Sequence, residues 1–314
     1  RPALSNEPGI CSRASEEQDS GTGGCILTRP QLDRPGTEAF NAPGQSSPIV
    51  RKLANFVDLS PGEIAALESL SHNRKTFAAG ETLVRQGSQP FSVFLILNGV
   101  AYRYKYLANG KRQIFGYLLA GDVCDAHFVL SRHSDHDIGL LTDAEVAMIP
   151  MHELVAVMAR YPNVRRALLK VSVVEDAILR EWLLNVGQRS APQKLAHFIC
   201  EISERLLGVG NINPDGSYEV PLTQLEVADT MGLTVVHVSR CLQKFRREGL
   251  VHWSRRQLTI LNLPRLRQVA GFDAGYLHIR SADLQSPDAA YARLAATERG
   301  QSPAVEISGR RNRG

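Results

Sequence analysis

The sequence has little that would place the chain in a membrane or link it by disulfides. No apolar run approaches the roughly 20 residues that a membrane-spanning helix needs. The cysteines are odd in number and widely spaced, which is typical of free thiols in a reducing compartment. They are Cys11, Cys25, Cys124, Cys200 and Cys241. The N-terminal stretch carries acidic residues at 16, 17 and 19 and has no apolar signal core, so we expect a cytoplasmic protein.

Charge of one sign is not in large excess either. A formal net charge of +4 neither demands nor excludes nucleic acid as a partner, so the position of the charge matters more than its sum. The chain has 314 residues, 43% of them hydrophobic, which is enough for two ordinary domains with real cores.

Both ends of the chain lack a periodic apolar pattern. Residues 1–47 are rich in Gly, Pro, Ser, Thr, Glu and Gln, so they bury too little surface to offset the entropy of ordering, and we expect a disordered extension. Residues 272–314 are predicted to form a mobile tail, within which Ser286 and Pro287 start one short helix. The folded part should therefore lie between residues 48 and 271.

Residues 48–160 show the pattern of a small β-domain that follows a helix. Ser60 and Glu63 form a capping box that starts the helix. Asn98-Gly99 and Asn109-Gly110 are turn pairs typical of hairpins. The predicted strands are short runs rich in β-branched and aromatic residues, at 91–97, 100–107, 113–119 and 144–149. Strands at this spacing indicate a small barrel or jelly roll.

A long helix is predicted over residues 161–187. Its apolar residues fall three or four apart and form one stripe: Val164, Leu168, Val171, Val174, Ile178, Trp182 and Val186. The pattern alone leaves two interpretations open, a helix packed on its own domain or a helix paired with its copy in a dimer. A second helix opens with the capping box of Ser190 and Gln193 and ends at Gly208.

The stretch from Leu222 to Leu261 predicts a winged helix-turn-helix within residues 188–271. Thr223 and Glu226 form a capping box for its first helix, and Gly232 supplies the left-handed residue that ends it. Thr234 then caps a second helix. The inner face of that helix is apolar: Val238, Cys241, Leu242 and Phe245.

The outer face of the second helix is polar and basic. Between Arg240 and Arg256 stand six Lys or Arg residues and one acid, Glu248, a local charge of +5 that suits phosphate neutralisation. A basic amphipathic helix alone is often just a solvated face. The small Ala228, the turn glycine and the predicted ribbon from Val251 to Leu261 favour a DNA-reading helix here.

The segment LTQLEVADTMGLTVVHVSRCLQKFRREGLV resembles the helix-turn-helix of the Crp/Fnr superfamily of bacterial transcription regulators, and the roll and long helix precede it in that family's order. The resemblance covers about residues 50–270. It implies an α+β chain with a cyclic-nucleotide-binding-like sensory β-roll (48–160), a dimerisation helix (161–187) and a winged helix-turn-helix (188–271). It further implies a homodimer on an inverted-repeat operator, RNA polymerase as a further partner, and no enzymatic activity. The predicted stripe would then be the dimer interface.

By position, the resemblance assigns DNA contacts to ten residues: Thr223, Gln224, Thr234, Val235, Val236, His237, Ser239, Arg240, Gln243 and Lys244. Arg240 is expected to reach guanine O6 and N7. The family usually has Glu where this chain has Val236, so the half-site need not match the common ones. We hypothesise that Val236 packs on a thymine methyl and that His237 adds a polar contact.

The ligand of the roll is not evident from the sequence. Cyclic-nucleotide-binding relatives carry a Gly-Glu element and a later Arg-Ser or Arg-Thr pair, whereas this chain has Gly121-Asp122, and Ser134-Asp135 begins an acidic stretch where the pair belongs. Carboxylates there would repel a cyclic phosphate. These four residues stay candidates for an unidentified small-molecule effector, and we expect no resident cofactor. A cyclic-nucleotide-responsive regulator remains an alternative.

Three further alternatives depend on other residues. A redox-responsive iron-sulfur regulator would need a tight N-terminal cysteine group, but Cys11 and Cys25 stand far apart and Ala147 occupies the later position. A metal-responsive regulator or a metal-dependent phosphohydrolase would use residues whose spacing matches no closed zinc pattern. They are Cys124, His127, His133, Asp135, His136 and Asp137. A pure dimerisation scaffold would leave the basic face unexplained. We therefore assign no catalytic residue and no metal ligand.

Overall fold

The computed structural model describes residues 46–279 apart from 125–132, 214 and 255. The predicted N-terminal extension up to residue 45, with Cys11 and Cys25, lies outside the described residues, as do His127 and the tail beyond residue 279. No helix among the described residues is both long and apolar enough to cross a membrane.

Two helices precede the roll, α1 (Pro48–Ala54) and α2 (Pro61–Ser69). The predicted capping box starts α2: Glu63 accepts a hydrogen bond from the Ser60 amide at 2.8 Å, and the Ser60 hydroxyl accepts one from the Glu63 amide. Ile49, Leu53 and Leu67 are fully buried, so both helices close one side of the core.

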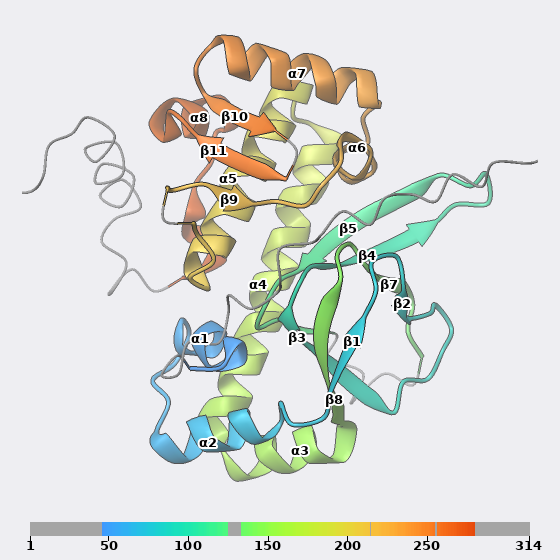
Figure 1. Cartoon of the computed structure of the whole chain (residues 1–314), viewed down its shortest axis with the longest axis vertical. Helices are drawn as coiled ribbons and strands as arrows, with labels where there is room; N and C mark the ends of the chain where they lie inside the picture. The colour runs from blue at the N-terminus through green and yellow to red at the C-terminus, as the bar shows by residue number, and fades with distance from the viewer. Residues whose placement is uncertain (1–45, 125–132, 214, 255, 280–314) are drawn as a thin grey trace, which may run out of the picture. The chain divides into compact units, whose positions relative to one another are not determined.

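The roll consists of two four-stranded antiparallel sheets, in the orders β1-β8-β3-β6 and β2-β7-β4-β5 (Figure 1). Its strands are β1 (Arg74–Phe77), β2 (Thr82–Val84), β3 (Ser92–Asn98), β4 (Ala101–Tyr106), β5 (Arg112–Leu118), β6 (Val123–Cys124), β7 (Asp137–Leu140) and β8 (Ala144–Pro150). Gly99 and Gly110 adopt φ of 91° and 79°, as the predicted turn pairs require. The jelly-roll prediction is confirmed.

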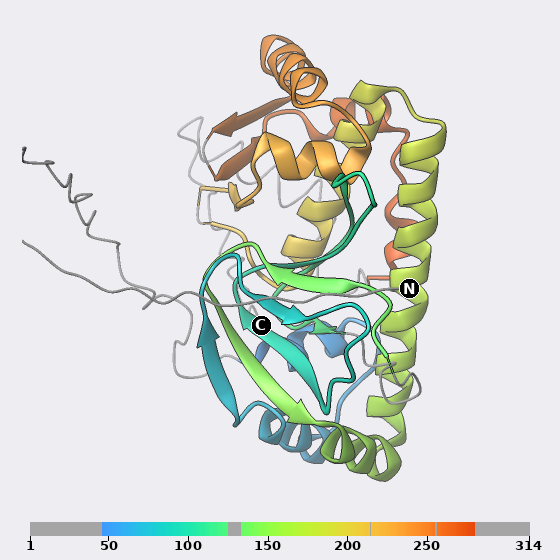
Figure 2. The ribbon, with the colours of Figure 1, turned by 90° about the vertical axis from the view of Figure 1, so that its right-hand side faces the viewer.

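Three helices follow the roll: α3 (Met151–Arg160), α4 (Pro162–Gly187) and α5 (Ala191–Gly208). The sequence did not predict α3. Figure 2 shows α4 as one continuous helix. The capping box of Ser190 and Gln193 begins α5, where the Gln193 side chain accepts the Ser190 amide at 2.9 Å.

The C-terminal part is a winged helix-turn-helix, as predicted. It contains β9 (Tyr218–Glu219), α6 (Gln224–Met231), α7 (Val235–Arg247), β10 (Val251–Ser254), β11 (Gln257–Ile260) and α8 (Leu263–Ala270). The strands form one antiparallel sheet in the order β10-β11-β9, and the hairpin of β10 and β11 is the wing.

The predicted dimer stripe on α4 faces the protein's own core along most of its length, whereas its last residue, Val186, is exposed. Val164, Leu168, Val174, Ile178 and Trp182 are all buried within the chain, so the assignment of this stripe to a dimer interface was wrong. The stripe packs inward because it meets apolar side chains of the roll and of α5, for example Tyr117 and Phe198 around Trp182. A different face of α4 is exposed and apolar.

Residues 272–279 also differ from the sequence-based expectation of a tail. They include the 3-10 helix η2 (Ala274–Leu277), whose Leu277 is buried. The Phe272 ring meets the His197 ring edge-on, with centroids 5.1 Å apart, and the Tyr276 hydroxyl donates to Glu201 at 2.9 Å. These partners on α5 stand some 75 residues earlier, which explains why the local sequence did not indicate packing.

Candidate nucleic-acid interface

The first helix of the motif, α6, is fixed at its start and in its last turn. The Thr223 hydroxyl accepts the Glu226 amide, and Glu226 in turn accepts the Thr223 amide at 2.7 Å. The Thr230 hydroxyl lies 2.7 Å from the hydroxyl of Tyr117 on β5, and the Gln113 side chain donates to the Thr230 carbonyl at 3.1 Å. The capping box sets where α6 begins, whereas β5 holds it in place.

A left-handed turn joins α6 to α7. Gly232 adopts φ 62° and ψ 37°, a conformation in which a Cβ is costly. The Leu233 amide donates to the Ala228 carbonyl at 3.1 Å across the turn. The buried Lys194 of α5 donates to the carbonyls of Met231 and Val186 at 3.4 and 3.1 Å, so the turn is also tied to the end of α4.

The second helix, α7, is capped and anchored as the sequence predicts. The Thr234 hydroxyl accepts the His237 amide at 3.3 Å. Val238, Cys241 and Phe245 are buried, and Leu242 is half-buried against the core. Because these residues recur every three or four positions, they hold one face of α7 inward and leave the opposite face open.

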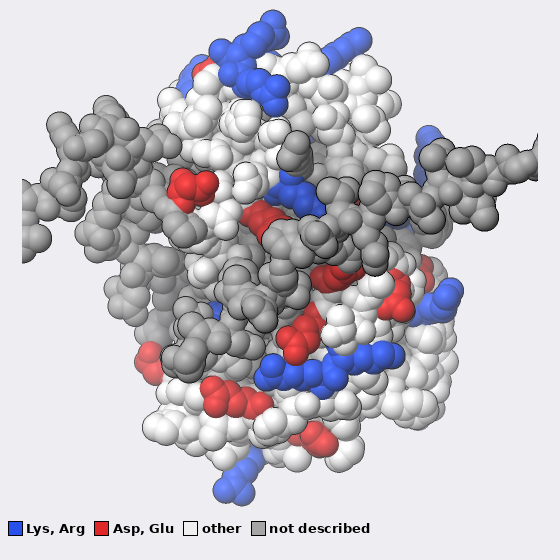
Figure 3. Space-filling view, in the orientation of Figure 1, with Lys and Arg blue, Asp and Glu red and all other residues white. Residues whose placement is uncertain are grey.

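The open face of α7 is basic. Arg240, Lys244, Arg246 and Arg247 are exposed, and Arg256 at the turn of the wing is exposed too. Figure 3 shows blue side chains at the upper edge of the view, where α7 lies in Figure 1. The wing is tied to the helix because the Arg246 guanidinium donates to the Trp253 carbonyl at 3.3 Å.

One acid shares this surface and neutralises little of it. Lys244 and Glu248 lie 3.8 Å apart with both side chains about half exposed, an arrangement worth a fraction of a kcal/mol. The surface thus offers several exposed basic side chains on a rigid helix and its neighbouring hairpin. Phosphate groups of a duplex suit such a surface, because each neutralised phosphate releases counterions.

The ten predicted contact residues fall on the starts of α6 and α7 and along the open face of α7. Thr223, Gln224, Thr234, Val235, Val236, His237, Arg240, Gln243 and Lys244 are exposed, and Ser239 is half-buried. Their shared exposure at one end and one face of the motif makes them accessible to a groove, and their DNA contacts remain a prediction.

Gly121 and Asp122 make internal contacts. A Cβ at Gly121 would lie 2.4 Å from the Pro48 carbonyl oxygen, so the absent side chain allows α1 to approach. Asp122 is buried and forms ion pairs with Lys52 and, at 3.4 Å, with Arg205. Burial alone would raise the pKa of Asp122, but the two cations outweigh it and lower that pKa. These contacts give both residues a structural role.

Ser134 and Asp135 lie in the loop just before β7. The buried Ser134 hydroxyl donates to the His136 carbonyl at 2.7 Å. Asp135 accepts from Lys105 at 3.1 Å and lies 2.7 Å from the His136 ring nitrogen Nδ1. The hydrogen bond to His136 lowers the pKa of Asp135 to about 2. Asp135 is therefore an anion, although Lys105 offsets part of its charge.

Metal ligands do not gather in the described part of the chain, where no group of three or more His, Cys, Asp or Glu side chains is placed to hold an ion. Cys124, Cys200 and Cys241 are buried. Burial raises the pKa of the Cys200 thiol to about 12, so this thiol is protonated and unreactive at neutral pH.

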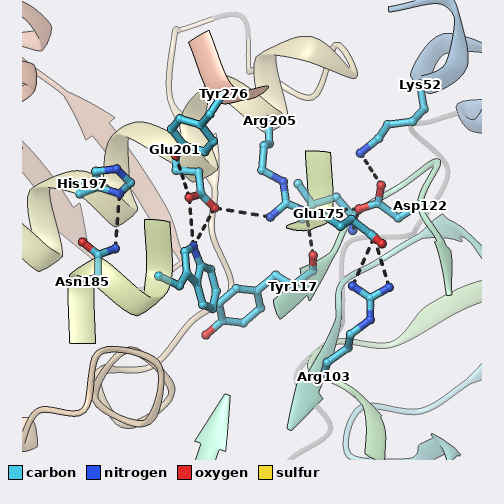
Figure 4. A network of polar contacts seen from close by, with 12 residues as sticks. Lys52, Arg103, Tyr117, Asp122, Glu175, Asn185, His197, Glu201, Arg205 and Tyr276 are labelled. Carbon is cyan, nitrogen blue, oxygen red and sulfur yellow. Dashed lines mark hydrogen bonds and ion pairs between the residues drawn. The ribbon is translucent and has the colours of Figure 1, made fainter. Parts of the chain in front are cut away.

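A polar network that the sequence did not indicate joins the roll, α4, α5 and η2 (Figure 4). Glu201 accepts the Trp182 indole N–H at 3.0 Å and the Tyr276 hydroxyl at 2.9 Å, and Arg205 donates to the Tyr117 carbonyl at 2.7 Å. Burial raises the pKa of Glu201 although Arg205 opposes the shift. Charged residues on the apolar face of α5 were the only local signal of this network.

Comparison with known proteins is consistent with this geometry. A family model described as a cyclic nucleotide-binding domain matches residues 74–161, and one described as a Crp-like helix-turn-helix domain matches residues 193–269. A probable transcriptional activator of Rhizobium leguminosarum bv. viciae is 31% identical over 196 residues, which cover 62% of this chain and 78% of that protein.

Two further proteins align over most of their length. Transcriptional activator protein FnrL of Cereibacter sphaeroides is 28% identical over 216 residues, covering 68% of this chain and 86% of that protein. The solved structure of FixK2 from Bradyrhizobium japonicum matches with a TM-score of 0.57 at 23% identity, covers 64% of this chain and 98% of that one, and shows the same fold.

Proposed function

We propose, from the premise that this chain belongs to the Crp/Fnr superfamily of DNA-binding transcription regulators, that two copies bind one inverted-repeat operator through their α7 helices. The observation that carries the proposal is the exposed basic face of α7, presented on a helix whose other face is locked into the core. Phosphate contacts would position the helix, and Arg240 would read guanine in the major groove.

The exposed apolar face of α4 supports the proposal of a second copy. Leu169, Val173, Leu179 and Leu183 are large apolar residues that the chain itself leaves exposed, with Leu183 at 72%. Leu169, Asp176 and Leu183 recur every seven residues, and Leu179 and Val186 each follow three residues after Asp176 and Leu183, the spacing of a two-helix seam. A second copy of the same helix would cover this face.

The dimer sets the form of the operator. Two recognition helices related by a two-fold axis would meet half-sites about 34 Å apart, one turn of DNA. Because relatives are named transcriptional activators, RNA polymerase is the proposed further partner, and the cytoplasm is the proposed location. An effector of the roll, if it acts, would do so by favouring one separation of the two helices.

The test is selection of bound duplexes from a random DNA pool, followed by binding measurements on the selected operator. Arg240→Ala should weaken binding by about 1–3 kcal/mol, roughly 5- to 150-fold, and relax the preference at one base position. Arg85→Gln, an exposed arginine of the roll, serves as the control. Selection of no common sequence, or unchanged discrimination by Arg240→Ala, would contradict the proposal.

A further inference from the structure

Two valines at the start of α7 are exposed to solvent. Val235 and Val236 are 41% and 56% exposed on the first turn of α7, where neither packs against the core. Each is a β-branched apolar residue at a solvent-facing helical position, which gains nothing from helix propensity or burial. Such residues contribute to the free energy of binding when a partner covers them.

Helical spacing distinguishes the two valines. Val235 lies three residues before the buried Val238 and four before the half-buried Ser239, so it sits at the edge of the inner face. Val236 lies four residues before Arg240 and seven before Gln243, both exposed. Val236 therefore belongs to the middle of the open face, in line with the arginine proposed to read a base.

The chemistry of the valine side chain limits what it can recognise in DNA. It has no hydrogen-bond donor or acceptor, so it cannot read the polar edges of guanine, adenine or cytosine. The 5-methyl group of thymine is the apolar feature of the natural major groove, and 5-methylcytosine carries the same group at the same place. A valine at the centre of the reading face fits a 5-methylpyrimidine.

We infer that Val236 makes this protein a reader of a pyrimidine 5-methyl group, supplied by thymine in each operator half-site. The inference rests on the proposed DNA binding and adds the base class that one position of the half-site must contain. His237 follows Val236, but its ring nitrogen lies 3.3 Å from the Thr234 hydroxyl, at the cap of the helix. The methyl contact is thus assigned to Val236 alone.

The test removes only the methyl group. In the selected operator, each thymine of both half-sites is replaced in turn by deoxyuridine, and the affinity of the full-length protein is measured at fixed salt. One methyl corresponds to about a fourfold change in affinity, so replacement at the contacted position in both half-sites should weaken binding about fifteenfold. Other thymine positions should respond less.

Protein variants connect the methyl to Val236. Val236→Ala should bind more weakly and lose its response to deoxyuridine at the contacted position, which is the coupling expected of two groups in contact. Val236→Thr keeps one methyl and should respond in between. Val155→Ala on α3, an exposed valine of the roll domain's last helix, should behave as the wild type.

Methylated cytosine distinguishes the source of the methyl. A C·G pair at the contacted position should weaken binding, and 5-methylcytosine at the same position should recover part of the lost affinity. Tighter binding to thymine than to 5-methylcytosine would identify thymine as the natural source of the methyl group. The inference is overturned if deoxyuridine has no effect anywhere, if Val236→Ala keeps the wild-type response, or if methylation of cytosine recovers nothing. Failure to select any operator would instead overturn the proposed function itself.

Discussion

Arg112 on β5 and Asp229 on α6 form an ion pair between the roll and the helix-turn-helix. The guanidinium nitrogens Nε and Nη2 lie 2.9 and 2.8 Å from the same carboxylate oxygen. Both side chains are about four-fifths buried, so water screens the pair less than it screens a surface pair. Together with the contacts of Thr230, the pair makes β5 the part of the roll that holds the first helix of the DNA-reading motif.

A double-mutant cycle measures this connection. Arg112→Gln and Asp229→Asn should each lower the free energy of unfolding by about 1–3 kcal/mol, with a coupling energy of about 1 kcal/mol, because each removes the nearest charge partner of a mostly buried group. The exposed pair of Lys105 and Asp135 provides a matched control, for which we expect a coupling below about 0.5 kcal/mol. Equal coupling energies in the two cycles would contradict a stabilising link between β5 and α6 through this pair.

Two glycines separate the effect of a clash from that of backbone strain. Gly121 and Gly110 adopt φ of 92° and 79°, but a Cβ at Gly121 would lie 2.4 Å from a backbone oxygen whereas one at Gly110 would meet nothing within 4 Å. Gly110→Ala should cost about 1 kcal/mol and Gly121→Ala more than about 3 kcal/mol. Thermal unfolding gives the comparison, and similar losses would contradict a close approach of α1.

If the exposed face of α4 forms the dimer interface, a charge placed on it should separate the subunits. Leu183→Glu should convert dimer to monomer and weaken operator binding, while leaving the monomer folded, because Leu183 is 72% exposed within its own chain. Sedimentation velocity and circular dichroism measure the two effects. Val155→Glu, which places the same charge on an exposed position of α3, should remain dimeric. A dimeric Leu183→Glu protein would place the interface elsewhere.

Salt dependence distinguishes positioning residues from reading residues. Arg247 is exposed on the open face of α7, and its replacement by Gln should weaken binding about equally on all sequences. The slope of log K against log salt should fall in magnitude by about one for each phosphate that the variant subunit no longer neutralises. Arg85→Gln should leave the slope unchanged, and an unchanged slope for Arg247→Gln would remove Arg247 from the interface.

The buried His197 predicts a loss of stability in acid. Burial, together with the nearby charge of Arg189, lowers the pKa of His197 to about 4, below its ordinary value of about 6.5. Between these values the unfolded chain binds a proton that the folded chain does not, so stability falls as pH decreases through this window.

The effect of His197 is best measured against a variant that cannot titrate. From pH 7 to pH 5 the wild type should lose about 2 kcal/mol more in free energy of unfolding than His197→Gln. Glu201, whose pKa burial raises, is common to both proteins, so its own contribution cancels in the difference. Urea denaturation at the two pH values gives the result, and equal losses would contradict a low pKa for His197.

The local features of the fold were readable from the sequence because each is formed within a few residues. The capping boxes at Ser60 and Thr223 and the left-handed turn at Gly232 involve neighbours at most five positions apart. Apolar spacing likewise placed Val238 and Phe245 inside and the basic residues of α7 outside. The helix-turn-helix followed from these local rules, whereas its candidate contact residues followed from the resemblance to a known family.

The stripe on α4 is a feature whose packing partner these local rules could not predict. Val164 to Trp182 repeats with helical spacing whether its partner is the same chain or a second one, so periodicity could not decide between them. Likewise the sequence makes Gly121 and Asp122 candidates for a ligand site, but it gives no sign that Asp122 pairs with Lys52, 70 residues away. The sequence by itself determined the capped starts of α2, α5, α6 and α7, the turns and the basic face of α7. Only the tertiary structure decided which face of α4 is left for a partner and which charges are used internally, because those outcomes depend on contacts between residues as far apart as Arg112 and Asp229, 117 positions along the chain.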